Sequence, residues 1–416
     1  MSSIDMLQVR SDCRLCGSRR LENILKLPAC PPVDNFRYAN EQNRALPAFP
    51  MDLYMCNDCG HAQLIDVVNP KILFGNYIYT SASSPDLNSH FSKYFIEVNN
   101  RFPATDGRLV IDIGSNDGLL LSKFRENGWR VQGVDPAATI AGLAIAAGVP
   151  TLVSFLNEDA VAQLLSSCGP ADLVTANNVF SHADDLHGFA VCVRNLLKPQ
   201  GIFVFEVSYL LDLVEGKVFD YIYHEHLAHH SVDPLRRFFD SVGMRLFDVE
   251  RVQTKGGSVR GFACLRDAPW ETSEVIEEFV AVEHRAGLYS KHTYERMGQF
   301  ITELGVKTRD TVTTLAGSGP VAGYGASATG TVITHCLGLA DRLSFVIDDN
   351  PARQGRLCPG NGCPVLPRQC LTDKNPAITF LAAWRFADLI ISRNADYLNR
   401  GGAFLVPLPE FRVVRH

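Results

Sequence analysis

The sequence predicts an α/β protein in which two successive α/β units follow a small cysteine-containing segment. Helical stretches separate four apolar, strand-like runs, which lie at residues 108–113, 131–134, 172–175 and 202–206. This alternation is typical of a parallel sheet with helices on both faces. The pattern begins again after residue 317, with apolar runs at 320–325, 343–347, 377–383 and 402–407. We therefore expect a second α/β unit at the end of the chain.

Three domains are expected from this pattern. The chain has 416 residues, of which 46% are hydrophobic, so it is long enough to form more than one core. We expect a loop-rich cysteine domain at 1–85, the first α/β unit at 86–270, and a helical connector with the second unit at 271–416. The connector is predicted at 272–316, which has no proline and carries apolar residues three and four positions apart.

Charge and hydropathy limit the possible partners. A net charge of −6, with charged residues well mixed along the chain, argues against a general binder of nucleic acid or anionic membranes. The first residues are polar and lack the apolar core of a signal peptide. No apolar run approaches the about 18 residues that a membrane-spanning helix needs. We expect a cytoplasmic protein, monomeric or weakly dimeric, with a small-molecule partner and with cysteines that are thiols or metal ligands.

Two CxxC pairs predict a structural metal site. They are Cys13-Arg-Leu-Cys16 and Cys56-Asn-Asp-Cys59. Each pair offers two thiolates at the spacing of one tetrahedral metal, and four cysteines complete a closed shell of the kind that holds structural Zn²⁺. Gly17 and Gly60 follow the second cysteine of each pair and permit a tight turn. The segment between the pairs is longer than in most zinc ribbons, so four unrelated thiols and a redox CxxC stay open as alternatives.

An apolar run that ends in a glycine-rich turn predicts a nucleotide site. Residues 109–113 are followed by Gly114-Ser115-Asn116-Asp117-Gly118 and by a helix-forming run at 119–125. Glycines allow the backbone to approach a ligand closely at the carboxyl end of a strand. Asp135 ends the next strand, where a carboxylate accepts hydrogen bonds from ribose hydroxyls. The spacing differs from the dinucleotide motif GxGxxG, although an NAD-type or ligand-free unit stays open as an alternative.

The sequence at 112–118, Asp-Ile-Gly-Ser-Asn-Asp-Gly, resembles motif I of the class I S-adenosylmethionine (SAM) methyltransferases. Residues 176–179 and 196–202 resemble two later motifs of the same fold, in the same order. The resemblance implies a Rossmann-like domain in which the loop surrounds the methionine part of SAM, Asp135 holds the ribose and Phe155 lies near the adenine. It implies cofactor contacts from Asp112, Gly114, Asn116, Gly118, Asp135, Phe155, Asn177 and Asn178.

A second group of candidate functional residues lies at 221–230, with the sequence Tyr-Ile-Tyr-His-Glu-His-Leu-Ala-His-His. One interpretation is a metal site, although the HExxH spacing is absent. Another is acid–base chemistry, since histidine titrates near neutrality and a glutamate or tyrosine can orient it or share its proton. A polar surface loop is a third interpretation, which stays open for His229 and His230.

Together these motifs resemble one family along almost the whole chain, the sugar C-methyltransferases of deoxysugar biosynthesis. The resemblance rests on the CxxC pairs, the 112–118 loop, the Tyr-x-Glu-His segment at 223–226, and the segments 256–260, 323–326 and 348–355. It implies an N-terminal zinc domain, a middle SAM domain and a C-terminal Rossmann-like domain, with a nucleotide-linked 4-keto sugar between the last two. By position it implies catalytic roles for His226, Glu225, Tyr223, His182 and Tyr79, with Tyr77 as a rival of Tyr79, and substrate contacts from Tyr324, Ser327 and Arg353.

The reaction that the resemblance implies is methyl transfer to C-3 of a nucleotide-linked, dTDP-type 4-keto-6-deoxysugar, with SAM and structural Zn²⁺ as cofactors. A carbon beside a ketone becomes nucleophilic when a base removes its proton and a donor stabilises the enolate oxygen. We expect His226 to be the base, and Tyr223, Glu225, His182 and Tyr79 to orient the sugar and stabilise the enolate.

The chain departs from the family pattern at two places. Thr329 stands where the family has a lysine, and residues 360–364, Gly-Asn-Gly-Cys-Pro, replace a Gly-Thr-His-Ile-Pro pattern. Both places lie where the nucleotide is expected. Two other functions therefore stay open: a SAM-dependent methyltransferase acting on another ketone, on oxygen or on nitrogen, and a non-catalytic SAM-fold zinc protein that mediates protein contacts.

Overall fold

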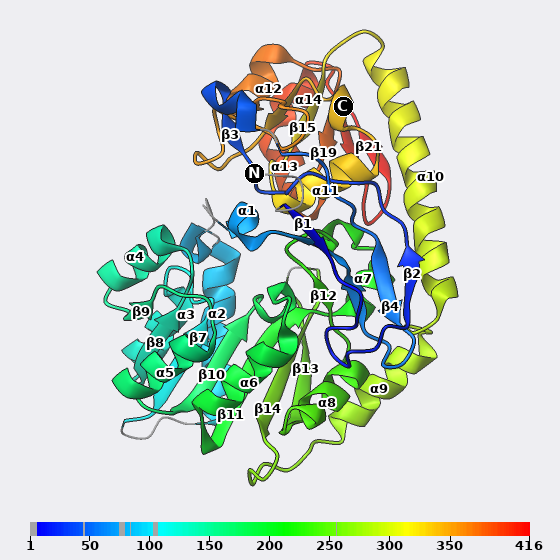
Figure 1. The fold of residues 1–416 in the computed structure, drawn as a ribbon. Coiled ribbons are helices and arrows are strands. Elements are labelled where there is room, and N and C mark those ends of the chain that lie inside the picture. The colour runs from blue at the N-terminus through cyan, green and yellow to red at the C-terminus, as the bar shows by residue number, and fades with distance from the viewer. Residues whose placement is uncertain (1–5, 45, 75–79, 84, 103–106, 255) are drawn as a thin grey trace.

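Three sheets and a long outer helix make up the fold (Figure 1). The computed structural model describes residues 6–416 except 45, 75–79, 84, 103–106 and 255. Over these residues the sheets have four, seven and six strands, and two short two-stranded pairs lie beside them. The described part of the chain has no helix with the length and apolar character that crossing a membrane requires.

The largest sheet has seven strands in the order β13-β14-β11-β10-β7-β8-β9. Their bounds are β7 Leu109–Ile113, β8 Arg130–Val134, β9 Thr151–Leu152, β10 Ala171–Asn177, β11 Leu197–Ser208, β13 Met244–Val252 and β14 Ser258–Leu265. Strands β7 to β11 are parallel, whereas β14 runs antiparallel to both β11 and β13. The four predicted runs are therefore parallel, as expected, and β13 and β14 add an antiparallel edge that was not predicted. Gly256 and Gly257, with φ angles of 89° and 118°, lie in the short connection that turns the chain back from β13 into β14.

Helices cover both faces of this sheet. On one face α2 (Pro85–Arg101), α3 (Leu119–Glu126) and α4 (Ala138–Ala146) share a core with Val110 and Leu173. On the other face α5 (Glu158–Ser167), α6 (Leu186–Leu196) and α8 (Val232–Ser241) share a core with Ile111 and Val174. Successive strand residues thus face opposite helix layers, as the pleat requires. Two short helices remain: α1 (Pro70–Phe74) follows the N-terminal strands, and α7 (Leu210–Glu215) follows β11.

The N-terminal region forms a four-stranded sheet that the middle region completes. Its strands are β2 Leu21–Leu25, β4 Leu53–Cys56, β5 Ala62–Leu64 and β12 Ala228–His229, in the order β12-β5-β4-β2. Two further antiparallel pairs join β1 (Leu7–Val9) to β6 (Asp66–Val68) and β3 (Arg37–Tyr38) to β17 (Arg356–Leu357). The N-terminal region is therefore hydrogen-bonded to both later regions, and the domain boundaries after residues 85 and 270 stay predictions.

The C-terminal region forms the second α/β unit, with the strand order β18-β16-β15-β19-β20-β21. Its strands are β15 Val321–Tyr324, β16 Phe345–Ile347, β18 Val365–Leu366, β19 Ile378–Leu381, β20 Phe404–Val406 and β21 Arg412–Val414. Its helices are α11 Ala328–Cys336, α12 Gln369–Lys374, α13 Ala387–Arg393 and α14 Ala395–Asn399. Each of the four apolar runs predicted here contains a strand, and the predicted fold class is confirmed.

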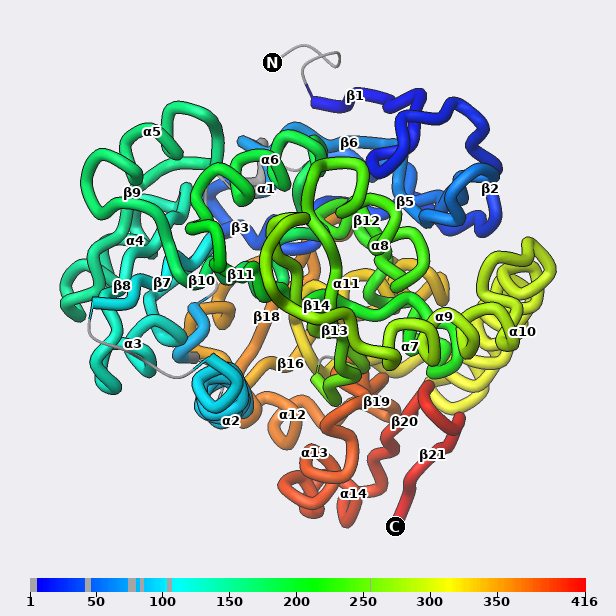
Figure 2. The backbone as a smooth tube through the Cα atoms, turned by 90° about the horizontal axis from the view of Figure 1, so that it is seen from below, coloured from blue at the N-terminus to red at the C-terminus, as the bar shows by residue number. Residues whose placement is uncertain are grey.

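The connector, predicted as one helical stretch, is two helices. The first, α9, spans Val275–Arg285, and the second, α10, spans Lys291–Ala316. Gly287 interrupts them with a φ of 65°, a left-handed conformation that a right-handed helix cannot contain. Helix α10 then runs along the outside of the molecule, where it packs against β2 of the N-terminal sheet and β19 of the C-terminal sheet (Figures 1 and 2).

Gly17 and Gly60 offer a matched test of how the cysteine pairs pack. Both have positive φ angles, 71° and 80°. A Cβ at Gly60 would lie 2.7 Å from Cδ1 of Tyr289, in the break between α9 and α10, whereas a Cβ at Gly17 would meet no atom within 4 Å. Gly17→Ala should cost about 1–2 kcal/mol of stability through its φ angle, and Gly60→Ala about 1–3 kcal/mol more through overpacking. Thermal unfolding followed by circular dichroism measures both, and equal melting temperatures of the two variants would contradict this packing.

Candidate active site

A cavity of about 670 Å³ lies at the carboxyl ends of the parallel strands. The residues that end β7, β8 and β10, Ile113, Val134 and Asn177, all line it. This edge is where open α/β sheets bind their ligands. Asp34 from the N-terminal region and Arg353 from the C-terminal region also line the cavity, so all three regions form its wall.

Most of the predicted site residues line this cavity. They are Gly114, Asn116, Asp135, Phe155, Asn177 and Asn178 on the predicted cofactor side, His182, Tyr223, Glu225 and His226 of the predicted catalytic group, and Ser327 and Arg353 of the predicted substrate contacts. Asp112, Gly118 and Tyr324 are not among the lining residues. Tyr79 and its rival Tyr77 fall outside the described residues. The chemical roles of these side chains stay predictions.

The loop between β7 and α3 is shaped so that its backbone faces the cavity. Gly114 has a φ of 69°, and a Cβ there would lie 2.3 Å from Cγ2 of Val179, so a larger residue does not fit. Asn116 also has a positive φ, 50°, and its Oδ1 accepts a hydrogen bond from the Ser81 amide at 2.8 Å. The Asn116 amide in turn donates to Oδ2 of Asp135 at 2.9 Å. The loop, the end of β8 and the segment at Ser81 therefore form one hydrogen-bonded unit.

Asp135 lies where the sequence predicts a ribose-binding carboxylate. Its Oδ1 accepts a second hydrogen bond, from the Ala137 amide at 2.9 Å. Burial raises the pKa of the Asp135 carboxyl, while the hydrogen bonds from the Ala137 and Asn116 amides lower it. A carboxylate oxygen can accept two hydrogen bonds, so each oxygen of Asp135 can accept another from a diol. Phe155, also in the cavity wall, is 52% exposed and offers an apolar ring face on which a flat heterocycle can stack.

Asp112, predicted to contact the cofactor, lies beneath the loop. Its Oδ1 accepts a hydrogen bond from Oγ1 of Thr175 at 2.6 Å, and these two residues are directly paired between β7 and β10. Burial raises the pKa of Asp112 to about 7. In the structure Asp112 therefore links two strands under the loop. Gly118 also lies outside the cavity wall. It precedes α3 with a φ of 78° and packs against Val149.

His226 stands at the centre of the predicted catalytic group. Its ring lies 5.2 Å from the ring of His182 and 4.1 Å from that of Tyr223, measured between centroids. Its Nδ1 lies 2.8 Å from the carbonyl oxygen of Tyr221. A carbonyl oxygen only accepts, so Nδ1 carries the proton of the neutral imidazole and the lone pair lies on Nε2. This is the tautomer that a general base acting through Nε2 needs.

The histidines that follow are buried, which corrects the surface-loop interpretation. His229 and His230 are 2% and 0% exposed. Burial lowers the pKa of each to about 3, so both are neutral at pH 7. His230 stacks on Phe180 with 5.0 Å between ring centroids. Over the described residues the four paired cysteines form the one group of three or more candidate ligands close enough to share an ion, so no such group supports the metal interpretation of this segment.

The C-terminal region contributes the N-terminal end of a helix to the cavity. Ser327 caps α11, since its Oγ accepts a hydrogen bond from the Gly330 amide at 3.1 Å. Ser327, Ala328 and Thr329 all line the cavity. Free amides and the helix dipole favour an anion at such a terminus. Arg353, whose Nη1 lies 3.7 Å from Oδ2 of Asp348, adds a positive charge to the same wall.

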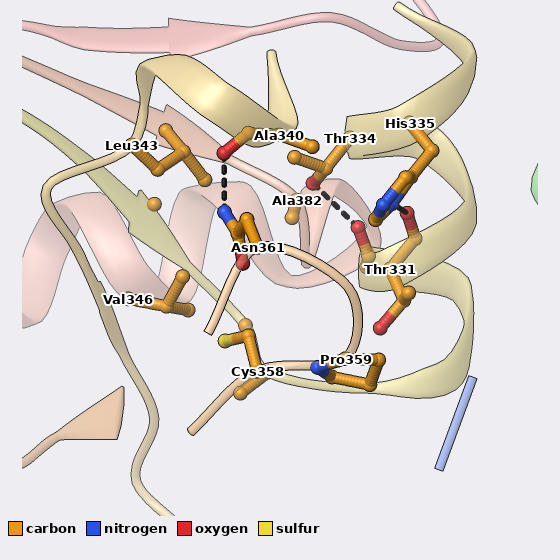
Figure 3. Close-up of a pocket in the computed structure, with 14 residues that line it drawn as sticks. Thr331, Thr334, His335, Ala340, Leu343, Val346, Cys358, Pro359, Asn361 and Ala382 are labelled. Atoms are coloured by element: carbon orange, nitrogen blue, oxygen red, sulfur yellow. Dashed lines mark hydrogen bonds between the residues drawn. The ribbon is translucent and has the colours of Figure 1, made fainter. Parts of the chain in front are cut away.

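A second, much smaller cavity lies beside residues 323–330 (Figure 3). Tyr324 lines neither this cavity nor the larger one. The smaller cavity has a volume of about 30 Å³, room for about two water molecules at most. Its polar side chains bond to nearby carbonyl groups: Thr334 to Gly330, His335 to Thr331 and Asn361 to Ala340. Tyr324 instead donates from its hydroxyl to the Asp349 carboxylate, 3.1 Å away. Of these two cavities, the one with room for a ligand is therefore the larger, which is lined by Ser327–Thr329.

The four cysteines of the two pairs come together as predicted. Their sulfur atoms all lie within 4.8 Å of one another, and two pairs, Cys13 with Cys59 and Cys16 with Cys56, are 3.5 Å apart. Zn²⁺ bonded to four sulfurs at about 2.3 Å sets them about 3.8 Å apart. The donor set and its dimensions therefore fit structural Zn²⁺, and a closed four-sulfur shell offers no position for a reactant.

The link between the first cysteine pair and the cavity was not predicted from the sequence. Arg14, which lies between Cys13 and Cys16, is buried, and its Nη2 lies 2.9 Å from Oδ1 of Asp184. Arg10 reaches the same oxygen at 3.2 Å. Asp184 lines the cavity two residues after His182. Asp34 and Tyr221 were also missed, since neither belongs to a motif, although Tyr221 stands in a segment that the histidines had already marked.

Three family models match the chain in order along its length. They describe a zinc binding domain at residues 13–74, a methyltransferase domain at 88–248 and a C-methyltransferase C-terminal domain at 253–409. Among curated proteins, the C-methyltransferase NovU of Streptomyces niveus is 32% identical over 412 residues, which cover 99% of this chain and 98% of NovU.

Two partial matches concern the middle region. The ubiquinone biosynthesis O-methyltransferase of Burkholderia mallei is 24% identical over 158 residues, 35% of this chain and 68% of that protein. The solved structure of magnesium protoporphyrin IX methyltransferase (ChlM) from Synechocystis PCC 6803 with bound SAM matches with a TM-score of 0.33 at 15% identity, over 46% of this chain and 88% of that chain.

Asp135→Asn should weaken SAM binding about tenfold to a hundredfold, because the ribose-binding role predicted for Asp135 depends on a charge-assisted hydrogen bond. Isothermal titration with SAM measures the change. Asp34→Asn is the matched control, since Asp34 lines the same cavity on the side of Arg353 and loses the same charge. An equal loss of SAM affinity in the two variants would show that the effect comes from the overall charge of the cavity and not from a contact between SAM and Asp135.

Asp112 should make stability fall with rising pH. The folded state keeps this proton up to about pH 7, whereas the unfolded chain loses it near pH 4. Unfolding thus releases a proton between these values, and the contribution of Asp112 to the free energy of unfolding decreases through that window. Asp112→Asn keeps an acceptor for Thr175 and removes the titration. Its melting temperature should drop less than that of the wild type between about pH 5 and about pH 7.5, and identical drops would contradict the shift.

Proposed function

Because this chain belongs to the family of SAM-dependent C-methyltransferases with a zinc-binding, a methyltransferase and a C-methyltransferase C-terminal domain, we propose that it methylates C-3 of a nucleotide-linked 4-keto-6-deoxysugar. The nucleotide is dTDP in this proposal. The observation that carries it is the group of His226, His182 and Tyr223. They line a cavity that reaches from the loop at 112–118 to the N-terminal end of α11. Carbon acceptors need such a base, because a C–H group is not nucleophilic until its proton is removed.

The domains and the location belong to the same proposal. Residues 1–85 form the zinc domain, 86–270 the SAM domain, and 271–416 the connector and the substrate-binding domain. The enzyme acts in the cytoplasm. This agrees with the state of its twelve cysteines, none of which forms a disulfide in the structure and four of which are the proposed zinc ligands, as in a reducing compartment.

The distribution of charge in the cavity supports two ligands of opposite charge. Asp135, Glu158 and Asp185 line it on the side of the seven-stranded sheet, where they favour a sulfonium cation. Arg353 and the N-terminal end of α11 line it on the side of the C-terminal sheet, where they favour a diphosphate. Thr329 still offers a hydroxyl at that end, so the family lysine is replaced by a neutral hydrogen-bonding group.

Proton removal is the step for which the residues of this chain are arranged. Nε2 of His226 takes the proton from C-3, and the electron pair of that bond moves into the enolate of the neighbouring ketone. Tyr223 donates a hydrogen bond to the enolate oxygen, while Glu225, His182 and Tyr79 orient the sugar. SAM, when bound, would supply the electrophilic methyl group: the electron pair at C-3 would form the new bond to this carbon while the sulfur–methyl bond breaks, which leaves S-adenosylhomocysteine. Much of the rate comes from holding the two reactants in line.

Solvent exchange tests the acceptor and the base together. With S-adenosylhomocysteine and a dTDP-4-keto-6-deoxysugar in deuterium oxide, we expect enzyme-dependent loss of the C-3 proton signal, followed by methyl transfer from labelled SAM when it is added. SAM binding with neither exchange nor transfer would overturn the proposed acceptor.

His226→Ala should lower the exchange rate by at least about a hundredfold, the usual contribution of a general base, and leave SAM affinity within about twofold. The matched control is His187→Ala, which changes an exposed histidine on α6. Exchange at the wild-type rate in His226→Ala would assign the base to another residue.

A further inference from the structure

A buried carboxylate ties the C-terminal region to the segment that carries His226. Asp220 is 0% exposed. Its Oδ2 accepts hydrogen bonds from Nε1 of Trp384 and Nη1 of Arg385, both at 2.9 Å, and its Oδ1 accepts one from Nη2 of Arg385 at 3.0 Å. We call these three residues the Asp220 clamp.

The geometry of the clamp is specific. Two parallel bonds from one guanidinium fix both the position and the plane of the carboxylate. The indole of Trp384 adds a third bond, and the Arg385 guanidinium carbon lies 4.0 Å from the Trp384 ring. A carboxylate removed from water needs such partners, because an unpaired buried charge is strongly unfavourable. The clamp therefore allows one arrangement of Asp220 relative to the C-terminal region.

The clamp acts on the carbonyl group that orients His226. Asp220 and Tyr221 belong to the same short turn, the 3₁₀ helix η5 (Phe219–Tyr221). The Arg385 guanidinium also lies over the ring of Tyr221, 4.8 Å from its centroid. One arginine thus fixes this turn through Asp220 and through the Tyr221 side chain. The Tyr221 carbonyl oxygen then accepts the hydrogen bond from Nδ1 of His226.

The other end of the same segment is fixed by the N-terminal sheet. The Leu64 amide donates to the Leu227 carbonyl oxygen at 2.9 Å, and β12 pairs with β5 directly afterwards. The segment 221–226 therefore spans two anchors, the clamp before it and the edge of the N-terminal sheet after it. With both ends fixed, the distance from Nδ1 of His226 to the Tyr221 carbonyl is set by the docking of two other regions.

We propose that Asp220, Trp384 and Arg385 are positioning residues through which the C-terminal region keeps His226 in the tautomer with the proton on Nδ1. This inference rests on the proposed role of His226 as the base. None of the three residues is among the described residues that line the cavity, so they act through Tyr221 and not on a reactant. The C-terminal region then does more than bind the acceptor, because it also determines which ring nitrogen of the base carries the proton.

The tautomer of His226 can be observed without any acceptor. In full-length protein with ¹⁵N-labelled histidine and bound SAM, two-bond ¹H–¹⁵N spectra distinguish the two neutral forms, and the spectrum of His226→Asn identifies the signal. We expect the Nδ1-protonated pattern in the wild type and a mixture of both tautomers in Trp384→Phe and Arg385→Lys. Trp384→Phe keeps an aromatic ring and removes the indole N–H donor. Arg385→Lys keeps the positive charge and removes the planar guanidinium. The control is Arg412→Lys, which alters an exposed ion pair with Asp388 in the same region.

Steady-state kinetics gives the second readout. We expect kcat of Trp384→Phe and Arg385→Lys to fall about tenfold or more, while KM for SAM and for the acceptor stays within about twofold, because a misplaced base impairs the step after binding. A wild-type tautomer pattern in both variants, or a rise in KM with unchanged kcat, would overturn the proposal. If the wild-type enzyme does not act on the sugar, the proposed function fails, yet the spectra still decide whether the clamp sets the tautomer.

Discussion

The hydrogen bond from Nδ1 of His226 to the carbonyl oxygen of Tyr221 is the interaction on which the candidate active site depends. It spans 2.8 Å between residues five apart in the chain, so it exists only while the segment between them keeps one shape. That segment has no regular secondary structure apart from the turn η5, and its shape comes from its anchors. The C-terminal region fixes one anchor and the N-terminal sheet fixes the other. The proposed base is thus located in the middle region but oriented by the two regions around it.

This dependence gives the zinc site a physical role. The sheet has four short strands, one of them of two residues, and small units of this kind usually need a metal or other cross-link. Zn²⁺ bound by the four cysteines would keep β4 and β5 in place, since Cys56 ends β4 and Cys59 lies in the turn before β5. Strand β5 then pairs with the edge strand β12, which follows His226 by two residues. A metal far from any reactant can in this way hold a catalytic segment in register.

The sequence revealed those features that depend on local spacing. The CxxC pairs, the 112–118 loop and the acidic end of β8 are each encoded within a few residues, so their geometry follows from the pattern alone. The break at Gly287 and the antiparallel turn at Gly256–Gly257 also carry a local signal, namely a glycine in a run of other residues, but glycine alone does not say whether a helix bends or ends. The partners of Asp220 and Arg14 carry no signal of this kind. Arg385 lies 165 residues after Asp220, and Asp184 lies 170 residues after Arg14. Such pairs are selected by the docking of whole regions, which composition and periodicity do not describe.

Arginines paired with carboxylates recur at the places where the cavity walls are joined. Arg14 joins the N-terminal region to Asp184, Arg385 joins the C-terminal region to Asp220, and Arg260 on β14 joins the sheet to Glu97 of α2, the helix whose Leu87 and Phe91 line the cavity. Apolar packing favours the burial of these walls but is not directional. A guanidinium bonded to a carboxylate favours one angle of approach, because both groups are planar and their donors and acceptors must align. Apolar contact at these junctions would therefore supply most of the stability, and the arginine pairs would select one arrangement among several of similar stability. A site that must hold two reactants and a base in line needs that selection more than it needs additional stability.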